Sequence, residues 1–238
     1  MWDYFPAVAS SYAGDIDDAI KLVTYIVGGW AALAYLIFFY FLFRYRRREG
    51  VRSQYVPGTG KAALWVILPV FVIAVFDFGI DIINHRIWTD IKINMPETTQ
   101  TVRVTARQWL WQFTYPGPDG KFDTPDDINT MNTLHAKLGA KTKFELRSAD
   151  VLHSFSIPAF RLKQDIIPGR VITGWFEAIK EGNYDLQCAE ICGLGHTNMG
   201  ARAIVHSAEN FEKALTAAAN MEKPDQVAAA NMGSVFGN

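Results

Sequence analysis

The sequence predicts a two-helix membrane anchor followed by an all-β sandwich domain. Two long apolar runs lie in the first third of the 238-residue chain. Seven short segments with the alternation or the aromatic content of β-strands follow between residues 101 and 206. The formal net charge of −1 gives no overall field that would attract nucleic acid, so we expect no nucleic-acid partner.

The first apolar run, residues 22–43, contains no charged residue and is long enough to cross the roughly 30 Å hydrocarbon core as a helix. The segment before it is acidic and no small-residue cleavage site follows it, so we expect a retained anchor rather than a cleaved signal. The second run, residues 62–76, continues through Asp77 and Asp81 to about Ile83. A buried helix of a soluble protein is the alternative, but no other part of the chain is apolar enough to bury either run.

The distribution of basic residues predicts the orientation in the membrane. The segment between the two runs holds one acid, Glu49, and six bases: Arg44, Arg46, Arg47, Arg48, Arg52 and Lys61. Short basic loops stay on the cytoplasmic side. We therefore expect a multi-pass protein of the bacterial plasma (inner) membrane, with both termini and everything after about residue 85 on the outer, periplasmic side. Disulfides are permitted there.

Between residues 101 and 206 the sequence contains several short strand-like segments separated by turn residues, which predicts an antiparallel sandwich or barrel. The expected strands are 101–107, 109–115, 142–148, 151–157, 170–179, 183–188 and 200–206. Residues 116–127 are rich in Pro, Gly and Asp and predict an exposed loop. Residues 208–223 predict one amphipathic helix. The expected division is an N-terminal segment with the hairpin (1–90), the β domain (91–207), and a C-terminal helix and tail (208–238).

The two cysteines, Cys188 and Cys192, lie in the stretch CAEICGLGHTNM together with His196 and Met199. A disulfide between them is possible but would close a very short loop and stabilise the fold little. A Cys2His2 zinc site is also possible with a distant histidine, but it leaves Met199 without a role. Both alternatives remain open from the residues alone.

Copper gives every member of this stretch a role. A copper site combines thiolate, imidazole and a weak thioether, and two cysteines can bridge two copper ions. The order Cys192, His196, Met199 supplies these donors on one loop, and His153 is the natural second imidazole, 35 residues before Cys188. Gly193 and Gly195 are expected to let the loop fold around the metals without Cβ clashes.

The chain resembles subunit II of the haem–copper terminal oxidases, the cytochrome c oxidases, over nearly its whole length. The family's copper A motif, Cys-x-Glu-x-Cys-x3-His-x2-Met, is matched at every position. The resemblance implies a cupredoxin-like Greek-key sandwich with a binuclear copper A centre. Cys188 and Cys192 would bridge the two coppers, with His153 and His196 as terminal ligands. Met199 and the Glu190 carbonyl oxygen would be the weak axial ligands, and the Glu190 side chain would face a magnesium or manganese ion at the boundary with subunit I.

Other segments also match the family. In ARQWLWQF (106–113), Trp109 aligns with the residue through which cytochrome c passes its electron, although a core tryptophan would explain it equally well without the family. Asp150 and Asp165 are candidate supporting or docking acids. Electrostatic docking of the donor is expected to use Asp123, Asp126 and Asp127. The remaining histidines, His85, His135 and His206, have no motif around them and are expected to be structural or interfacial.

The resemblance implies an electron-transfer subunit of an oxidoreductase and translocase in the respiratory chain. Its partners would be haem-bearing subunit I, other oxidase subunits, cytochrome c and membrane lipid, and this chain would bind no haem. The carboxylate that many members place before the second span is absent, with Ala62 and Ala63 in its region. The alternatives are a copper A subunit of a nitric oxide reductase or, from another class, a membrane-tethered copper chaperone or sensor. A quinol oxidase subunit is disfavoured because that branch has lost the copper ligands.

Overall fold

The computed structural model describes residues 5–52, 55 and 57–221, which form two compact units. One unit, residues 15–93, is a pair of helices. The other joins residues 5–14 to the part of the chain that begins at Asn94. The expected division had its first boundary at residue 90 and placed the N-terminal segment with the hairpin, whereas in the structure residues 5–14 group with the β domain.

The helical unit contains α1 (Ala13–Arg44) and α2 (Lys61–Trp88), the latter continuing as a short π-helical turn, η2 (Thr89–Ile93). Both helices are long and apolar enough to cross a membrane, and none of their most apolar stretch is buried, unlike the core helix of a soluble protein. Trp30 of α1 packs edge-on against Phe76 of α2, with 5.9 Å between ring centroids. The two expected spans are present, and each helix extends beyond the predicted apolar run.

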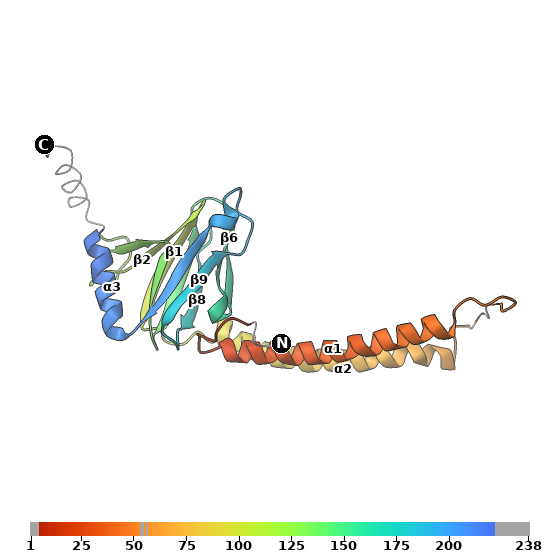
Figure 1. Cartoon of the computed structure of the whole chain (residues 1–238). Coiled ribbons are helices and arrows are strands. Elements are labelled where there is room, and N and C mark those ends of the chain that lie inside the picture. The colour runs from red at the N-terminus through yellow and green to blue at the C-terminus, as the bar shows by residue number, and fades with distance from the viewer. Residues whose placement is uncertain (1–4, 53–54, 56, 222–238) are drawn as a thin grey trace. The chain divides into compact units, whose positions relative to one another are not determined.

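The second unit is a sandwich of two five-stranded sheets (Figure 1). The first sheet has the order β3-β2-β1-β5-β8 and the second β4-β10-β9-β6-β7. The strands are β1 (Gln100–Arg107), β2 (Leu110–Tyr115), β3 (Ile128–Met131), β4 (Thr133–Lys137), β5 (Lys141–Ser148), β6 (His153–Ile157), β7 (Leu162–Ile166), β8 (Ile172–Glu177), β9 (Gly182–Cys188) and β10 (Gly200–His206). The chain passes from one sheet to the other between β3 and β4, β4 and β5, β5 and β6, β7 and β8, and β8 and β9, as in a Greek-key sandwich.

The sheets are mixed rather than purely antiparallel. β1 runs parallel to β5 in the first sheet, and β4 runs parallel to β10 in the second. The alternation that predicted the strands fixes which face of a strand is buried but does not fix the direction of its neighbour. The sandwich is confirmed, whereas the expectation of uniformly antiparallel pairing is wrong.

Aromatic side chains from both sheets meet in the core. Phe155 of β6 contacts Trp111 of β2 and Phe144 of β5, with centroid distances of 5.9 and 5.8 Å. All three side chains are fully buried. Burying one such side chain contributes roughly 1.5–3 kcal/mol, so these contacts hold the two sheets together at the level of β6, the strand that carries His153.

Residues 9–12, the N-terminal strap, add a segment to the sandwich that the sequence did not indicate. Ser10 forms a bridge with Ala178, directly after β8, and Ile179 donates its backbone N–H to the Ala9 carbonyl at 3.0 Å. The fully buried Ser10 hydroxyl donates to the Phe160 carbonyl at 2.8 Å. Tyr12 packs edge-on against Trp175 of β8. The strap covers the outer edge of β8.

The C-terminal helix α3 (Ala208–Met221) packs against β3, β4 and β10 (Figure 1). It agrees with the expected amphipathic helix, whose last two residues and the tail to residue 238 lie outside the described residues. Three strands, β3, β4 and β7, were not expected. Each is only four or five residues long and at least half of its residues are polar, so the apolar pattern is too weak to predict it.

Candidate metal centre

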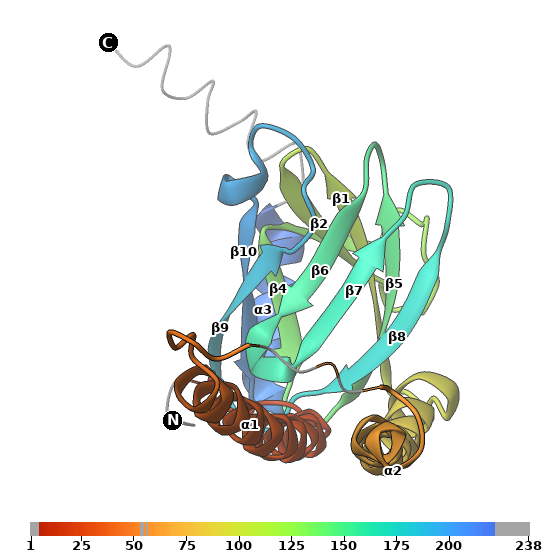
Figure 2. The same cartoon turned by 90° about the vertical axis from the view of Figure 1, so that its right-hand side faces the viewer.

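Two neighbouring strands of the second sheet bring the cysteines to an imidazole. His153 opens β6 and Cys188 closes β9, and these strands pair with Phe155 opposite Cys188. The connection from β9 to β10, residues 189–199, lies at one end of the sandwich (Figure 2) and carries Cys192, His196 and Met199. His153 and Cys188, which are 35 positions apart in the sequence, therefore meet because β6 begins where the neighbouring strand β9 ends.

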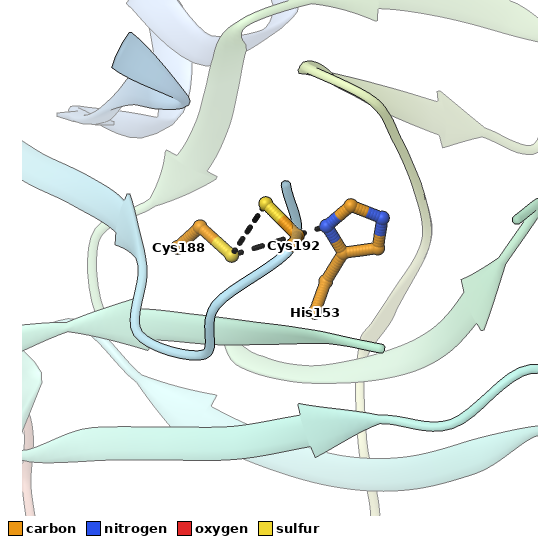
Figure 3. Close-up of side chains that lie close together, drawn as sticks. All are labelled: His153, Cys188 and Cys192. Carbon is orange, nitrogen blue, oxygen red and sulfur yellow. Dashed lines mark hydrogen bonds between the residues drawn. The ribbon is translucent and has the colours of Figure 1, made fainter. Parts of the chain in front are cut away.

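The side chains of His153, Cys188 and Cys192 converge, and their ligating atoms all lie within 4.8 Å of one another (Figure 3). The two Sγ atoms are 3.8 Å apart, and His153 Nδ1 lies 3.9 Å from Cys188 Sγ. Both cysteines are buried and free, so the disulfide is not formed. Two sulfurs that share one soft metal ion at about 2.3 Å each can be up to about 4.6 Å apart, so the observed spacing suits bridging thiolates.

The loop supplies the remaining donors. His196 Nδ1 lies 3.5 Å from Cys192 Sγ, and Met199 Sδ lies 3.7 Å from the same sulfur. The backbone oxygen of Glu190 lies 3.2 Å from Cys188 Sγ. Each sulfur thus faces one imidazole and one weak donor. All six predicted donor groups are brought together.

Burial, together with the adjacent Cys188 thiol, raises the pKa of the Cys192 thiol to about 11. The thiol is therefore protonated at neutral pH in the metal-free chain. Metal ions bind the thiolate, so uptake must displace this proton. A buried site that disfavours free thiolates suits a bound cation that compensates their charge.

Asp150 fixes the orientation of His153. Its Oδ1 accepts hydrogen bonds from His153 Nε2 at 2.8 Å and from the Val151 backbone N–H at 2.6 Å. Its Oδ2 accepts one from the Gln108 backbone N–H at 2.7 Å. With Nε2 donating to the carboxylate, Nδ1 presents its lone pair toward Cys188, as a metal-binding histidine requires. The prediction that Asp150 supports the site agrees with this geometry.

The Trp109 side chain packs against the loop that joins Cys192 to His196, next to Gly193 and Gly195. A Cβ atom on Gly195 would be 2.4 Å from Trp109 Cδ2, and one on Gly193 would be 2.8 Å from Gln108 Nε2. Gly193 also has a φ of 114°. The two glycines are therefore required by the approach of Trp109 and Gln108, and the expectation that they also let the loop fold around metal ions stays a prediction.

Gln108 is a residue that the sequence did not reveal. Its side-chain Nε2 donates to the Cys192 carbonyl at 2.7 Å, while its backbone N–H donates to Asp150. It thereby connects the loop carrying Cys192 to the carboxylate that orients His153. Its position beside the matched Trp109 is the one signal that could have drawn attention to it.

The Glu190 side chain pairs with Lys163 of β7. Lys163 Nζ lies 3.0 Å from Glu190 Oε1 and 3.0 Å from Asp165 Oδ1. The hydrogen bond from Lys163 lowers the pKa of Asp165. A magnesium or manganese ion at Glu190 would have to displace this ammonium group.

The acidic loop is far from Trp109. Residues 116–127 follow the last residue of β2, whereas Trp109 precedes its first, so the two lie at opposite ends of that strand. The Asp123 carboxylate pairs with Arg103 at 2.6 Å, and Asp127 Oδ2 accepts from the Asp123 backbone N–H. These acids are engaged locally and are poorly placed to meet a donor at Trp109.

The donor set is rich in sulfur and nitrogen, which excludes the oxygen-ligated ions calcium and magnesium from this centre. Two thiols, two imidazoles and a thioether suit copper, and the first four alone would also suit tetrahedral zinc. The buried thioether of Met199 favours copper, because it offers nothing to zinc.

Comparison with known proteins gives the same family. The family model described as cytochrome c oxidase subunit II, periplasmic domain, matches residues 123–207. The alternative cytochrome c oxidase subunit 2 of Bradyrhizobium diazoefficiens is 31% identical over 234 residues, covering 88% of this chain and 82% of the relative. The cytochrome c oxidase subunit 2 of Cereibacter sphaeroides is 25% identical over 239 residues, covering 87% and 77%.

Among solved structures, the periplasmic domain of subunit II of cytochrome oxidase from Bradyrhizobium japonicum is similar to 53% of this chain. It is 28% identical, is itself covered to 98%, and has a TM-score of 0.48. The family assignment rests on the sequence relatives, of which the Bradyrhizobium diazoefficiens protein aligns with 88% of this chain. The chain therefore belongs to the cytochrome c oxidase subunit II family and is a membrane-anchored subunit of an oxidoreductase complex.

Proposed function

We propose that this chain is the electron-entry subunit of a respiratory cytochrome c oxidase. It takes single electrons from cytochrome c on the periplasmic side and passes them to haem in subunit I. Oxygen is reduced to water there, with coupled proton pumping. The observation that carries the proposal is the convergence of two thiols, two imidazoles, a thioether and a carbonyl oxygen beneath Trp109.

The proposed ligands of the copper A centre are His153, Cys188, Cys192, His196, Met199 and the carbonyl oxygen of Glu190. When bound, a copper pair supplies a one-electron carrier whose charge is shared between two ions. The protein holds the donors rigidly. Cys188 and His153 belong to paired strands, and the backbone N–H of Cys188 donates to the Met199 carbonyl at 3.2 Å. The Trp111 indole N–H donates to the same carbonyl at 3.3 Å.

Metal analysis and electron paramagnetic resonance of the copper-loaded full-length chain test this assignment. We expect two coppers per chain and one unpaired electron shared between them. A Met199→Leu variant should keep both coppers but show an altered spectrum, whereas Cys192→Ser should lose the shared-electron signal. One zinc per chain, or one copper with a single-ion spectrum, would refute the assignment and favour the zinc site or a copper chaperone.

The terminal acceptor is tested on the intact complex. We expect oxygen consumption driven by reduced cytochrome c. Consumption of nitric oxide without oxygen reduction would instead identify the chain as the copper A subunit of a nitric oxide reductase. The missing carboxylate near Ala62 keeps this alternative relevant, because nitric oxide reduction does not require proton uptake from the inside.

The surface around Trp109 favours an apolar docking site for the electron donor. Leu194 is 99% exposed and Ile191 77% exposed on the same loop, and Trp109 is 41% exposed. We expect Leu194→Glu to raise the KM for reduced cytochrome c while the copper signal is unchanged. The matched control is Asp123→Asn, at the other end of β2, which should change neither. A steep fall in rate with ionic strength would instead support electrostatic docking.

We also propose that one side of α2 packs on subunit I. Successive helical residues are about 100° apart, so Asp77 and Asp81 lie roughly 100° and 140° around the helix from Phe76, which contacts α1. Both carboxylates are exposed. Charged groups within a span normally face protein or water. Asp77→Leu should therefore impair assembly or turnover of the complex, and unchanged assembly with unchanged turnover would eliminate this proposal.

The Glu190 carboxylate remains a proposed ligand for magnesium or manganese at the boundary with subunit I. The ion would replace Lys163 as its partner. Manganese bound to the assembled complex should be detectable by its resonance spectrum and lost in Glu190→Gln. Equal manganese content in that variant would contradict the proposal.

A further inference from the structure

Two histidines outside the metal centre face each other on the second sheet. His135 lies in β4 and His206 ends the parallel neighbour β10, in which Ile204 is opposite His135. His206 is thus two residues further along and points to the same face. The rings stack with centroids 5.1 Å apart and planes at 23°, and His135 Nδ1 lies 2.9 Å from His206 Nε2.

The pair is well separated from the cysteine loop. β10 begins at Gly200, beside that loop, and ends at His206. Six residues of strand correspond to roughly 20 Å. Any ion bound by the two histidines would therefore form a site distinct from the one at Cys188 and Cys192.

The 2.9 Å separation fits either a hydrogen bond or a shared ion. Two imidazole nitrogens bound at a right angle to one ion, each at about 2.0–2.1 Å, would lie about 2.9 Å apart. A right angle is the geometry of adjacent ligands in the tetragonal complexes of Cu(II), whereas the tetrahedral angle of zinc would place them about 3.3–3.4 Å apart.

Both rings are in the protonation state that binds metals. Burial, with a smaller contribution from the charge of His206, lowers the pKa of His135 to about 4. Burial also lowers the pKa of His206, partly opposed by the carboxylate of Glu181. Each neutral ring at pH 7 has one nitrogen lone pair. When the ring that donates the hydrogen bond moves its proton to its other nitrogen, both facing nitrogens can bind an ion without net loss of a proton.

The surroundings provide space and negative charge. His135 and Glu212 of α3 both line an open cavity of about 370 Å³. The Glu212 side chain is 69% exposed and lies 3.8 Å from Lys137 Nζ, so this ion pair is weak and leaves the carboxylate able to turn. The backbone of His135 is fixed by Tyr115, whose hydroxyl accepts from its N–H at 2.6 Å and donates to its carbonyl at 3.0 Å.

We propose that His135 and His206 bind one divalent transition-metal ion, Cu(II) more tightly than Zn(II), with Glu212 as an oxygen ligand and water completing the coordination. The preference follows from the right-angle spacing and from the general order of affinities for nitrogen ligands. Lys137 competes with the ion for Glu212. The site is independent of the metal bound at the cysteines.

The test uses the full-length chain in detergent, with the cysteine centre first saturated with copper. Further Cu(II) is added in competition with a chelator of known affinity, and paramagnetic resonance follows the added ion. We expect one additional Cu(II) per chain with a tetragonal spectrum showing coupling to two nitrogens. His135→Asn and His206→Asn should each weaken this binding by tenfold or more, and Zn(II) should compete only at higher concentration.

Two further variants separate ligation from folding. His85→Asn, in α2, is the matched control and should bind like the unaltered chain. Lys137→Gln keeps both histidines and releases Glu212, so it should bind Cu(II) more tightly, a gain that misfolding cannot produce. Absence of additional Cu(II) in the unaltered chain, or equal uptake by the His206→Asn variant, would overturn the proposal.

Discussion

Replacing Asp150 by asparagine should weaken metal binding at the cysteine centre. The carboxylate uses both oxygens, accepting from Gln108 with one and from Val151 and His153 with the other. Asparagine has one acceptor oxygen. If that oxygen serves His153, the amide NH2 faces the Gln108 N–H, one hydrogen bond is lost and the negative charge behind the imidazole disappears.

Loss of a group that orients a metal-binding histidine typically reduces metal affinity by about 10- to 100-fold, or about 1.4–2.7 kcal/mol. The assay is competition for copper between the loaded full-length chain and a chelator, followed by the absorption of the centre. Asp123→Asn, which removes a carboxylate paired with Arg103, is the control. Copper affinity within twofold of the unaltered chain would refute the orienting role of Asp150.

The pH dependence of copper binding at the cysteine centre gives a second measure of the role of Asp150. Partial burial acts to raise the pKa of Asp150, but hydrogen bonds from Gln108, His153 and Val151 outweigh it and hold the pKa below its ordinary value. The contribution of the carboxylate is therefore complete above the ordinary aspartate range and is lost only as the pH falls below that range. In Asp150→Asn this acid-induced loss of copper should be smaller, because the titrating group is absent.

Three other predictions concern the loop below Trp109, the N-terminal strap and His135. Gly195→Ala would place a Cβ 2.4 Å from Trp109. Electron entry from cytochrome c, measured by stopped flow, should therefore slow while copper remains bound. Gly200→Ala is the control, because its Cβ would meet nothing closer than 4.0 Å. Ser10→Ala removes a buried hydroxyl that donates to the Phe160 carbonyl, and it should lower the free energy of unfolding by about 1–3 kcal/mol, measured in urea. The pKa of His135 is lowered from 6.5 to about 4. With metal removed, its contribution to the free energy of unfolding should be complete above pH 6.5 and should be lost as the pH drops toward 4. His135→Asn should flatten this pH profile of stability, and an unchanged profile would exclude His135 as its source.

The sequence predicted those elements whose burial follows a strong local pattern. β1 and β5 alternate buried and partly exposed residues along most of their length, and both were predicted to within one residue. β4 buries only Leu134 and Ala136, and its position is fixed by pairing with β10, more than 60 residues later. Such long-range pairing leaves no local signal, which also explains the unexpected parallel neighbours.

The same distinction applies to the metal centre. The donors on one loop could be predicted because their spacing is itself the chemical pattern, and His153 was predicted as the second imidazole, from an earlier strand, before the family resemblance was considered. The parts that depend on tertiary contacts could not be predicted. The bond from Gln108 to the Cys192 carbonyl joins residues 84 apart, and the contact of His135 with His206 joins residues 71 apart.

The N-terminal strap has a consequence for membrane topology. Its hydrogen bonds join Ser10 to Phe160 and Ala9 to Ile179, so these residues must occupy the same aqueous compartment. A chain that leaves a compartment and returns to it crosses the membrane an even number of times. The strap can therefore reach β8 only if both helices have crossed the membrane. A polypeptide with only one helix inserted would have the strap and β8 on opposite sides of the bilayer. The edge of the sandwich at β8 would then lack its covering segment.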